Sequence, residues 1–413
     1  MRAVLDQILR RFIVLGRLTV RWPDEQLTTY TGEPGPEALL QLRDWRTVRR
    51  IALNPALAVG EAYMDGGLVP VDGPIYDVLD LLVTNLAAET SRHPIARARY
   101  ALARFTRRIA QFNPAPRARR NVAHHYDLNG RLYSLFLDRD RQYSCAYFPR
   151  GDETLDEAQI AKKRHIASKL KLDRPDLTVL DIGSGWGGLA LTLAREYGAR
   201  VTGITLSSEQ HAESQARAAA EGLSDRVTFE LLDYRALHRR FDRIVSVGMF
   251  EHVGVGHYRG FFEVVKRCLA PDGVALLHAI GRSDGPAGTN PWIAKYIFPG
   301  GYCPALSEVL PPIEKAGLTT TDIEILRLHY AETLRHWRRR FAANRDAIMG
   351  LYDERFCRMF EFYFAGAELA FRREGHMVFQ IQLTRDQSAV PLTRDYMFEA
   401  ERAATARVRV SAQ

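Results

Sequence analysis

The sequence predicts an α/β protein in which a doubly wound parallel sheet follows a smaller, mostly helical α+β domain. Strand-like and helix-like segments alternate from residue 178 onward, which is the pattern of a parallel sheet with helices on both faces. The 413 residues are enough for about two or three domains. With 46% hydrophobic and 26% charged residues, the composition is that of a globular protein rather than a disordered or fibrous one.

The first 116 residues are expected to form the smaller domain, and residues 117–413 the larger one. The smaller domain begins with apolar residues at helical spacing and continues with short β-like segments before a second helix. The Asn-Pro-Ala-Pro sequence at 113–116 interrupts helical structure and is predicted to be the linker. The expected elements are a helix over 1–16, strands over 18–22 and 26–30, and a helix near 78–87.

The larger domain is expected to consist of alternating strands and helices. Continuous apolar runs predict strands that are buried on both faces, and amphipathic runs between them predict helices. A late segment, 377–383, alternates apolar and polar residues and is predicted to be an edge strand with one exposed face. The expected strands are 178–182, 200–205, 227–231, 243–247 and 274–278, and the expected helices are 187–197 and 208–221.

The chain is basic, with 57 Lys and Arg against 49 Asp and Glu and a net charge of +8. This balance favours a polyanionic partner, and beyond basicity nothing in the sequence indicates nucleic acid rather than an anionic membrane. Residues 92–120 contain nine arginines and no acidic residue, and their apolar residues form one helical stripe. The pattern is typical of a helix lying on a membrane, but a solvated helix packed on a neighbouring domain would show it too.

Neither a membrane span nor a cysteine-based site is indicated. No run approaches the ~18 apolar residues of a spanning helix, so a membrane would be met at its surface. Cys145, Cys268, Cys303 and Cys357 form no C-x-x-C pair, which argues against a zinc site or a disulfide framework. The sequence thus predicts a reduced, cytoplasmic protein with no metal site, associated peripherally with the inner face of the membrane.

A glycine-rich turn follows the first strand of the larger domain. Val-Leu-Asp-Ile-Gly-Ser-Gly-Trp-Gly-Gly spans 179–188, directly before a predicted helix. Glycines allow a close backbone approach to a ligand, and the helix N-terminus adds donors. The glycine spacing also fits a dinucleotide loop, but the next strand ends in Thr-Leu-Ser, without the acid that holds a ribose diol. With Asp181 two residues before Gly183, the turn indicates the S-adenosylmethionine loop of a Rossmann-like class I methyltransferase.

Several further segments give the chain its resemblance to a family. The segments are Y-S-C-A-Y-F at 143–148, D-I-G-S-G-W-G-G at 181–188, G-I-T-L-S at 203–207, V-G-M-F-E-H-V-G at 247–254, L-L-H-A-I-G at 276–281, P-W-I-A-K-Y-I-F-P at 291–299 and G-E-A-Y-M-D-G at 60–66. In these segments, from about residue 125 to the C-terminus and in part of the smaller domain, the sequence resembles the cyclopropane-fatty-acyl-phospholipid synthases and their mycolic-acid cyclopropane synthase relatives. The first 50 residues match only weakly.

The resemblance implies that the protein uses S-adenosylmethionine to convert the cis double bond of a phospholipid acyl chain into a cyclopropane. An alkene is a weak nucleophile, so the sulfonium methyl must be held in line with it in a water-free slot. Methyl transfer leaves a carbocation, which needs nearby negative charge or aromatic faces. A base must then remove a proton from the new methyl group so that the ring closes.

By the same resemblance, the base is a bound bicarbonate held by a cradle of five residues. His, Tyr and backbone N–H groups are donors suited to a small oxyanion, whereas a carboxylate tolerates the anion only if bicarbonate donates its own O–H to it. The cradle residues are Cys145, Glu251, His278, Ile280 through its backbone N–H, and Tyr330.

The resemblance also places the cofactor residues. The glycine turn is expected to meet the methionine part, the second strand the ribose and carboxylate, and the third strand the adenine. The expected cofactor-binding residues are Tyr143, Ser144, Asp181, Gly183, Gly185, Gly187, Thr205, Leu206, Gln210, Asp233 and Tyr234.

Two positions depart from the family pattern. Ser184 stands in the glycine turn where many relatives have cysteine, which indicates that a thiol there is not essential. Ala367 stands where many relatives have a late-helix cysteine once proposed as a nucleophile. Covalent cysteine catalysis through that position is therefore not expected.

Other functions compete with cyclopropanation. A related enzyme could leave a methyl branch on a lipid chain or methylate an amine, the latter through Glu251 and His252. A binding protein with a vestigial methyltransferase fold is a third possibility, but the glycine turn and the acid and histidine set are intact.

The expected partners are an anionic bilayer surface, a lipid acyl chain and a second copy of the chain in a homodimer, with no nucleic acid.

Overall fold

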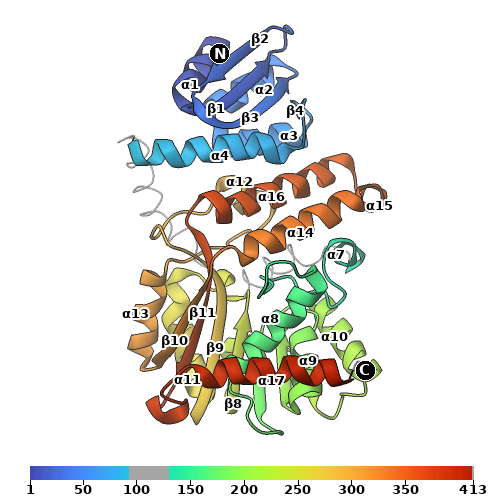
Figure 1. The fold of residues 1–413 in the computed structure, drawn as a ribbon, viewed down its shortest axis with the longest axis vertical. Coiled ribbons are helices and arrows are strands. Elements are labelled where there is room, and N and C mark those ends of the chain that lie inside the picture. Colours follow the sequence, from blue (N-terminus) through green and yellow to red (C-terminus); the bar gives the residue numbers. More distant parts are fainter. Residues whose placement is uncertain (93–129, 412–413) are drawn as a thin grey trace. The chain divides into compact units, whose positions relative to one another are not determined.

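The computed structural model describes residues 1–92 and 130–411 (Figure 1). Within these residues the chain forms two compact units. The first contains residues 1–92, 287–299 and 331–376, and the second contains residues 130–286, 300–330 and 377–411. Residues 287–299 and 331–376, which the sequence assigns to the larger domain, thus cluster with the N-terminal region. The linker expected at 113–116 and residues 93–120 of the basic segment lie outside the described residues.

The first unit is built around a four-stranded sheet in the order β2-β1-β3-β4. Its strands are β1 (Leu15–Arg21), β2 (Leu27–Thr31), β3 (Glu33–Leu42) and β4 (Leu68–Pro70), and its N-terminal helices are α1 (Arg2–Phe12), α2 (Trp45–Leu53), α3 (Pro55–Met64) and α4 (Ile75–Arg92). The later segments add α12 (Pro291–Tyr296), most of α14 (His329–Ala343), α15 (Arg345–Leu351) and α16 (Glu354–Arg373).

One continuous core explains why α16 belongs to the first unit. Ala365 and Leu369 of α16 are fully buried in the same apolar cluster as Leu18 and Val20 of β1. Asn85 of α4 also fixes β1, because its Oδ1 accepts hydrogen bonds from the backbone N–H groups that begin the strand, at 2.8 and 2.9 Å. Satisfying these buried backbone donors stabilises the junction of strand and helix.

The second unit is a seven-stranded sheet in the order β10-β11-β9-β8-β5-β6-β7. Strands β9, β8, β5, β6 and β7 pair in parallel, and β10 pairs antiparallel with β11. The strands are β5 (Thr178–Ile182), β6 (Arg200–Thr205), β7 (Val227–Leu231), β8 (Phe241–Val247), β9 (Leu269–Arg282), β10 (Thr319–Leu326) and β11 (His376–Thr384). The predicted α/β fold with a parallel, doubly wound sheet is confirmed.

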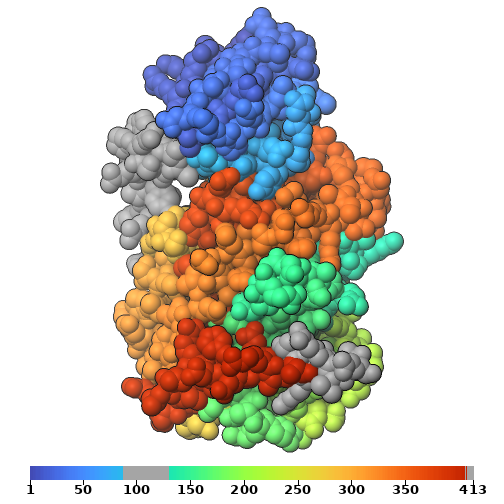
Figure 2. Space-filling model, viewed as in Figure 1, coloured from blue at the N-terminus to red at the C-terminus, as the bar shows by residue number. Residues whose placement is uncertain are grey.

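Helices cover both faces of this sheet, because alternate strand residues enter different cores. Val179 of β5 packs in one apolar cluster, and Leu180 and Ile182 pack in the other. The first cluster is covered by α8 (Leu155–Lys169), α9 (Gly188–Tyr197) and α10 (Ser208–Ala220). The second is covered by α11 (Tyr258–Cys268) and α13 (Leu306–Ala316). The remaining helices of this unit are α7 (Gly130–Phe136) and α17 (Asp395–Ser411), the latter seen crossing the face drawn in Figure 2.

The prediction that residues 377–383 form an edge strand is wrong. They lie in β11, which runs between β10 and β9 and is buried on both faces. The two glutamines that suggested an exposed face, Gln380 and Gln382, are buried because both hydrogen bond to Lys169, one to its side chain and one to its backbone. No helix in the described ranges is long and apolar enough to cross a bilayer.

Candidate active site

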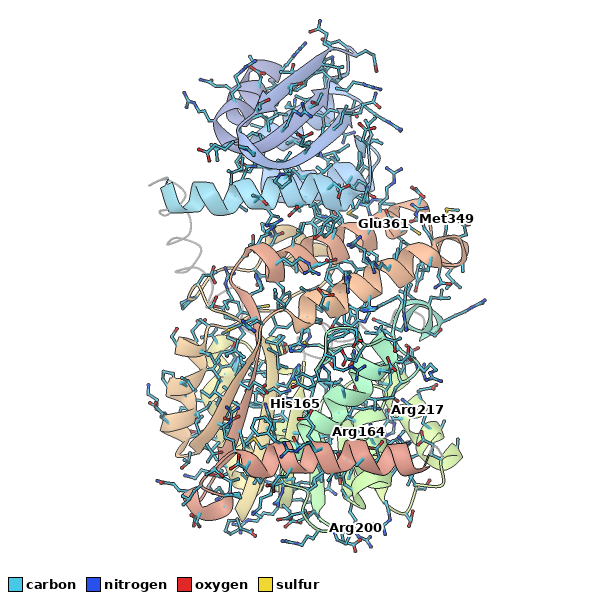
Figure 3. The ribbon with its side chains drawn as sticks, in the orientation of Figure 1. Arg164, His165, Arg200, Arg217, Met349 and Glu361 are labelled. Atoms are coloured by element: carbon cyan, nitrogen blue, oxygen red, sulfur yellow. The ribbon has the colours of Figure 1, made fainter. Side chains whose placement is uncertain are left out.

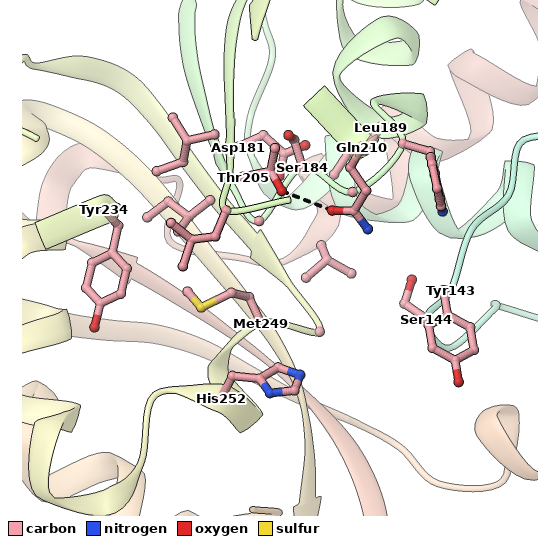
Figure 4. A pocket seen from close by; sticks show the side chains of 18 of the residues that line it. Tyr143, Ser144, Asp181, Ser184, Leu189, Thr205, Gln210, Tyr234, Met249 and His252 are labelled. Carbon is pink, nitrogen blue, oxygen red and sulfur yellow. Dashed lines mark hydrogen bonds between the residues drawn. The ribbon is translucent and has the colours of Figure 1, made fainter. Parts of the chain in front are cut away.

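A pocket opens at the carboxyl ends of the central parallel strands of the second unit (Figure 4). Its lining comes from the glycine turn after β5 and from the segments that follow β6, β7 and β8. Ligands of open α/β sheets bind in this place, where the strand order reverses between β5 and its neighbours. The position therefore marks this pocket as the candidate ligand-binding site of the second unit.

The pocket gathers nearly all residues that the sequence assigned to cofactor binding. Gly187 does not line it, because the space beside its Cα is occupied by Phe229 and Ser214. The lining also includes Arg141, Trp186, Met249 and His252, of which only His252 was noted in the sequence. The predicted residues in the lining are Tyr143, Ser144, Asp181, Gly183, Gly185, Thr205, Leu206, Gln210, Asp233 and Tyr234.

The glycine turn adopts backbone conformations that other residues rarely take. Gly183, Gly185 and Gly187 have φ angles of +85°, +55° and +82°. A Cβ atom at Gly183 would stand 2.8 Å from Cβ of Met249, and both residues line the pocket. The turn therefore needs glycine both for its conformation and for space.

We expect Gly183→Ala to weaken S-adenosylmethionine binding by roughly tenfold, because left-handed backbone costs about 1–2 kcal/mol for an L-residue and Met249 must move. Isothermal titration calorimetry measures the change. Gly222→Ala is the matched control, since Gly222 has a φ of +66° but open space around it. Equal affinities for both variants would contradict this reading of the turn.

Two buried polar atoms in the pocket wall have no hydrogen-bond partner among the described residues. They are Oδ2 of Asp181 and Oγ of Ser184. Burial raises the pKa of Asp181 to about 7, although nearby Lys162 opposes this shift. An unpaired buried carboxyl group beside a pocket is suited to a cationic ligand, and the α-ammonium and sulfonium of S-adenosylmethionine supply such charge. The unpaired carboxyl oxygen of Asp181 and the unpaired hydroxyl group of Ser184 therefore fit this cofactor.

Two other residues that the sequence assigns to cofactor binding are already oriented by neighbours. Thr205 Oγ1 donates to Oε1 of Gln210 at 3.0 Å (Figure 4). The side-chain amide of Gln210 therefore keeps its N–H groups as donors for a carboxylate or hydroxyl. Asp233 accepts from the Arg235 side chain at 2.9 and 2.7 Å, so its carboxylate is charge-paired beside the expected adenine position.

The five predicted cradle residues lie outside the pocket lining, and the structure joins two of them directly. Glu251 Oε1 accepts the backbone N–H of Ile280 at 2.7 Å, while its Oε2 is buried without a partner among the described residues. Burial raises the pKa of Glu251 to about 7, against the Ile280 hydrogen bond. An anion bound at Ile280 must therefore share this donor with Glu251.

The other three cradle residues, Cys145, His278 and Tyr330, are also buried. Cys145 adjoins Ser144 of the pocket wall, and its thiol donates to the carbonyl of Ala146 at 3.3 Å. His278 lies near the end of β9, where burial lowers its pKa well below the usual value and Lys162 adds to the effect. Tyr330 begins α14 next to His329, whose Nδ1 accepts the backbone N–H of Phe148 at 3.0 Å.

Fold and site together define a class I methyltransferase with an S-adenosylmethionine pocket. Residues 114–381 match the model of the mycolic acid cyclopropane synthetase family, and the chain belongs to this family. It is therefore an S-adenosylmethionine-dependent enzyme, either of cyclopropane fatty acid synthesis or of a related lipid methylation.

Individual relatives agree with the family. A probable fatty acid methyltransferase of Pseudomonas putida is 41% identical over 289 residues, 67% of this chain and 73% of its own. The cyclopropane-fatty-acyl-phospholipid synthase of Escherichia coli K12 is 40% identical over 344 residues, covering 82% and 85%. The solved structure of mycolic acid cyclopropane synthase CmaA1 complexed with SAH and CTAB superposes with a TM-score of 0.62 at 34% identity, covering 66% of this chain and 99% of that one.

Proposed function

We propose that the protein transfers a methylene group from S-adenosylmethionine to the cis double bond of unsaturated phospholipid acyl chains, with bound bicarbonate as the base. The observation that carries the proposal is the buried Glu251 carboxyl, which is held by Ile280 and keeps one oxygen unpaired. Glu251 directly precedes His252 of the pocket wall. Ring closure needs a base at the transferred methyl group, and a buried carboxyl group with an unpaired oxygen is suited to holding such a base.

The cofactor supplies an electrophilic methyl group when it is bound, and the chain's residues do the rest. Asp181 and Gln210 of the pocket lining would hold its charged and polar groups. In the cradle, Glu251 accepts the O–H of bicarbonate, while His278 and Tyr330 donate to its oxygens. The buried carboxyl also places negative charge near the carbocation that forms on the lipid.

Removal of bicarbonate tests the assigned base. In carbon-dioxide-free buffer we expect turnover of an unsaturated phospholipid to fall by at least tenfold and to recover when bicarbonate is added, because the general base contributes on the order of 10²–10⁴ to the rate. Lipid mass spectrometry measures the product. A rate that does not change on depletion would assign the proton transfer to a residue of the chain instead.

Membrane docking remains part of the proposal and involves residues outside the described ranges. We expect charge reversal at Arg104, Arg107 and Arg108 to lower the affinity for anionic vesicles, measured by co-sedimentation, by at least about 100-fold, since each basic residue near such a surface contributes about 1 kcal/mol. S-adenosylmethionine binding by the same variant is the control. Undiminished sedimentation would remove the basic segment from the docking surface.

A methyl-branching enzyme is the second candidate. The Pseudomonas putida relative is named a probable fatty acid methyltransferase, and such an enzyme would share the cofactor pocket and the lipid substrate. It differs in how the carbocation is resolved. A branch that keeps all three hydrogens of the transferred methyl group forms when a neighbouring chain carbon loses the proton instead, which leaves a displaced double bond. The product distinguishes the two reactions directly.

A further inference from the structure

A buried chain of polar side chains reaches His278 from neighbouring elements of the second unit. Lys169, at the end of α8, donates through Nζ to Oε1 of Gln380 at 2.6 Å. Nε2 of Gln380 lies 3.1 Å from Nδ1 of His278. All three side chains are at most 2% exposed, so water does not compete for these contacts.

The chemistry of the donors fixes the direction of every hydrogen bond in this chain. An ammonium group only donates, so the carbonyl oxygen of the Gln380 amide must face Lys169. The amide NH₂ group then faces His278, and it also only donates. Nδ1 of His278 must therefore accept, and in the neutral imidazole the proton resides on Nε2.

Burial lowers the pKa of Lys169, and an acidic neighbour opposes this shift. Glu324 of β10 forms an ion pair with Lys169 and accepts a hydrogen bond from Nε2 of His165 at 2.6 Å. Nδ1 of His165, a residue labelled in Figure 3, lies 3.3 Å from the carboxylate of Glu401 in α17. Although burial opposes it, the pairing with His165 and Lys169 lowers the pKa of Glu324 to about 2. The carboxylate thus stays ionised and opposes loss of the Lys169 proton.

We propose that Lys169 and Gln380 are positioning residues that hold His278 as the neutral tautomer with its proton on Nε2. A proton on Nδ1 would place two donors against each other in a buried site, which excludes both the other tautomer and the imidazolium. The hydrogen bond with Gln380 engages only Nδ1 of His278, which leaves the Nε2–H group as the ring's donor. On the proposed function, this N–H donates to the bound oxyanion, and His278 orients the base without acting as one.

Nuclear magnetic resonance of the full-length protein labelled with ¹⁵N-histidine tests the inference. The His278 signals are assigned by their loss in His278→Asn. We expect Nδ1 to show the shift of an unprotonated, pyridine-type ring nitrogen and Nε2 that of an N–H nitrogen. A protonated Nδ1, alone or together with Nε2, would overturn the proposal, and this measurement on the unmodified protein needs no other variant to fold.

Two matched substitutions separate positioning from general destabilisation. Gln380→Glu replaces the donor facing Nδ1 by an acceptor, so the proton should move to Nδ1 and turnover should fall by about 100-fold with little change in S-adenosylmethionine binding. Gln382→Glu is the control, because Gln382 is equally buried on β11 but bonds to Thr321, Tyr396 and the Lys169 backbone. The tautomer of His278 should not change there, and a change would count against the proposal.

The two readouts keep this inference distinct from the proposed function. If Gln380→Glu moves the proton but turnover is unchanged, the tautomer assignment stands and the role of His278 in anion binding fails. If Gln380→Glu leaves the proton on Nε2, the assignment of Lys169 and Gln380 as positioning residues fails.

Discussion

Replacing Glu251 by glutamine should lower turnover of an unsaturated lipid by about 10²–10⁴-fold while leaving S-adenosylmethionine affinity within a factor of about three. Glutamine has nearly the same shape, and its amide oxygen can still accept the backbone N–H of Ile280, so the local fold should persist. What is lost is the negative charge and the acceptor at the unpaired Oε2. The effect therefore falls on the chemical step.

The control for this variant is another carboxyl group in the same unit. Glu308 accepts from the Tyr302 hydroxyl at 2.7 Å and from the backbone N–H of Ala305 at 3.1 Å, so Glu308→Gln should alter stability without changing kcat appreciably. Steady-state kinetics with calorimetric cofactor binding give both quantities. A Glu251→Gln enzyme with unaltered kcat would remove Glu251 from the reaction.

Replacing Asp181 by asparagine should weaken S-adenosylmethionine binding by roughly 10–100-fold at pH 8, because a hydrogen bond to a charged group contributes about 1.5–3 kcal/mol. The carboxyl is buried in the pocket wall with Oδ2 unpaired among the described residues. Asparagine keeps the shape but loses the charge that attracts a cationic ligand. Calorimetry at several pH values measures the effect.

The elevated pKa of Asp181 gives this prediction a pH dependence. Its pKa is about 7 in the unliganded protein, so the ionised form that binds a cation prevails above pH 7 and is lost below it. Affinity should therefore fall by up to tenfold per pH unit below about 7 in the unmodified protein. The Asp181→Asn protein should lack this dependence, and parallel curves for the two proteins would contradict the assignment.

The same shift predicts a gain in stability for Asp181→Asn. The folded carboxyl holds its proton up to about pH 7, whereas the unfolded one releases it near its ordinary pKa of about 4. The folded state thus binds more protons over this interval, and the contribution of Asp181 to stability decreases as the pH rises. Removing the charge should raise the melting temperature of the unliganded protein at pH 8, a trade between stability and binding that is common at functional sites.

The strands of the parallel sheet and the glycine turn in the second unit were predicted well because each is marked by a few consecutive residues. The buried strand Thr178–Ile182 contains three branched apolar residues in a stretch of five, and the glycine turn follows it directly. The family resemblance supplied the expected cofactor residues, and most of them line the pocket beyond the carboxyl ends of the parallel strands, where ligands of such sheets bind. The agreement at Asp181, Thr205 and Asp233 has this origin.

The predictions failed where a residue contacts a part of the chain that is distant in sequence. The polar residues of β11 were interpreted as an exposed face, but Gln380 and Gln382 are buried against Lys169, more than 200 positions earlier in the sequence. The packing of Ala365 and Leu369 with β1 likewise has no local signal. Within the site, Met249 was missed because an apolar residue carries no chemical signature, whereas His252, noted only for the alternative amine chemistry, could have been placed from its position next to Glu251.

The most direct test of the proposed cyclopropanation uses S-adenosylmethionine with a fully deuterated methyl group. The purified protein is incubated with vesicles of an anionic unsaturated phospholipid, and the acyl chains are analysed by mass spectrometry. We expect a product that retains two of the three deuterium atoms, because ring closure requires removal of one hydrogen from the transferred methyl group. Retention of all three in a methyl branch would contradict the account, since no base would then have acted on the new methyl group.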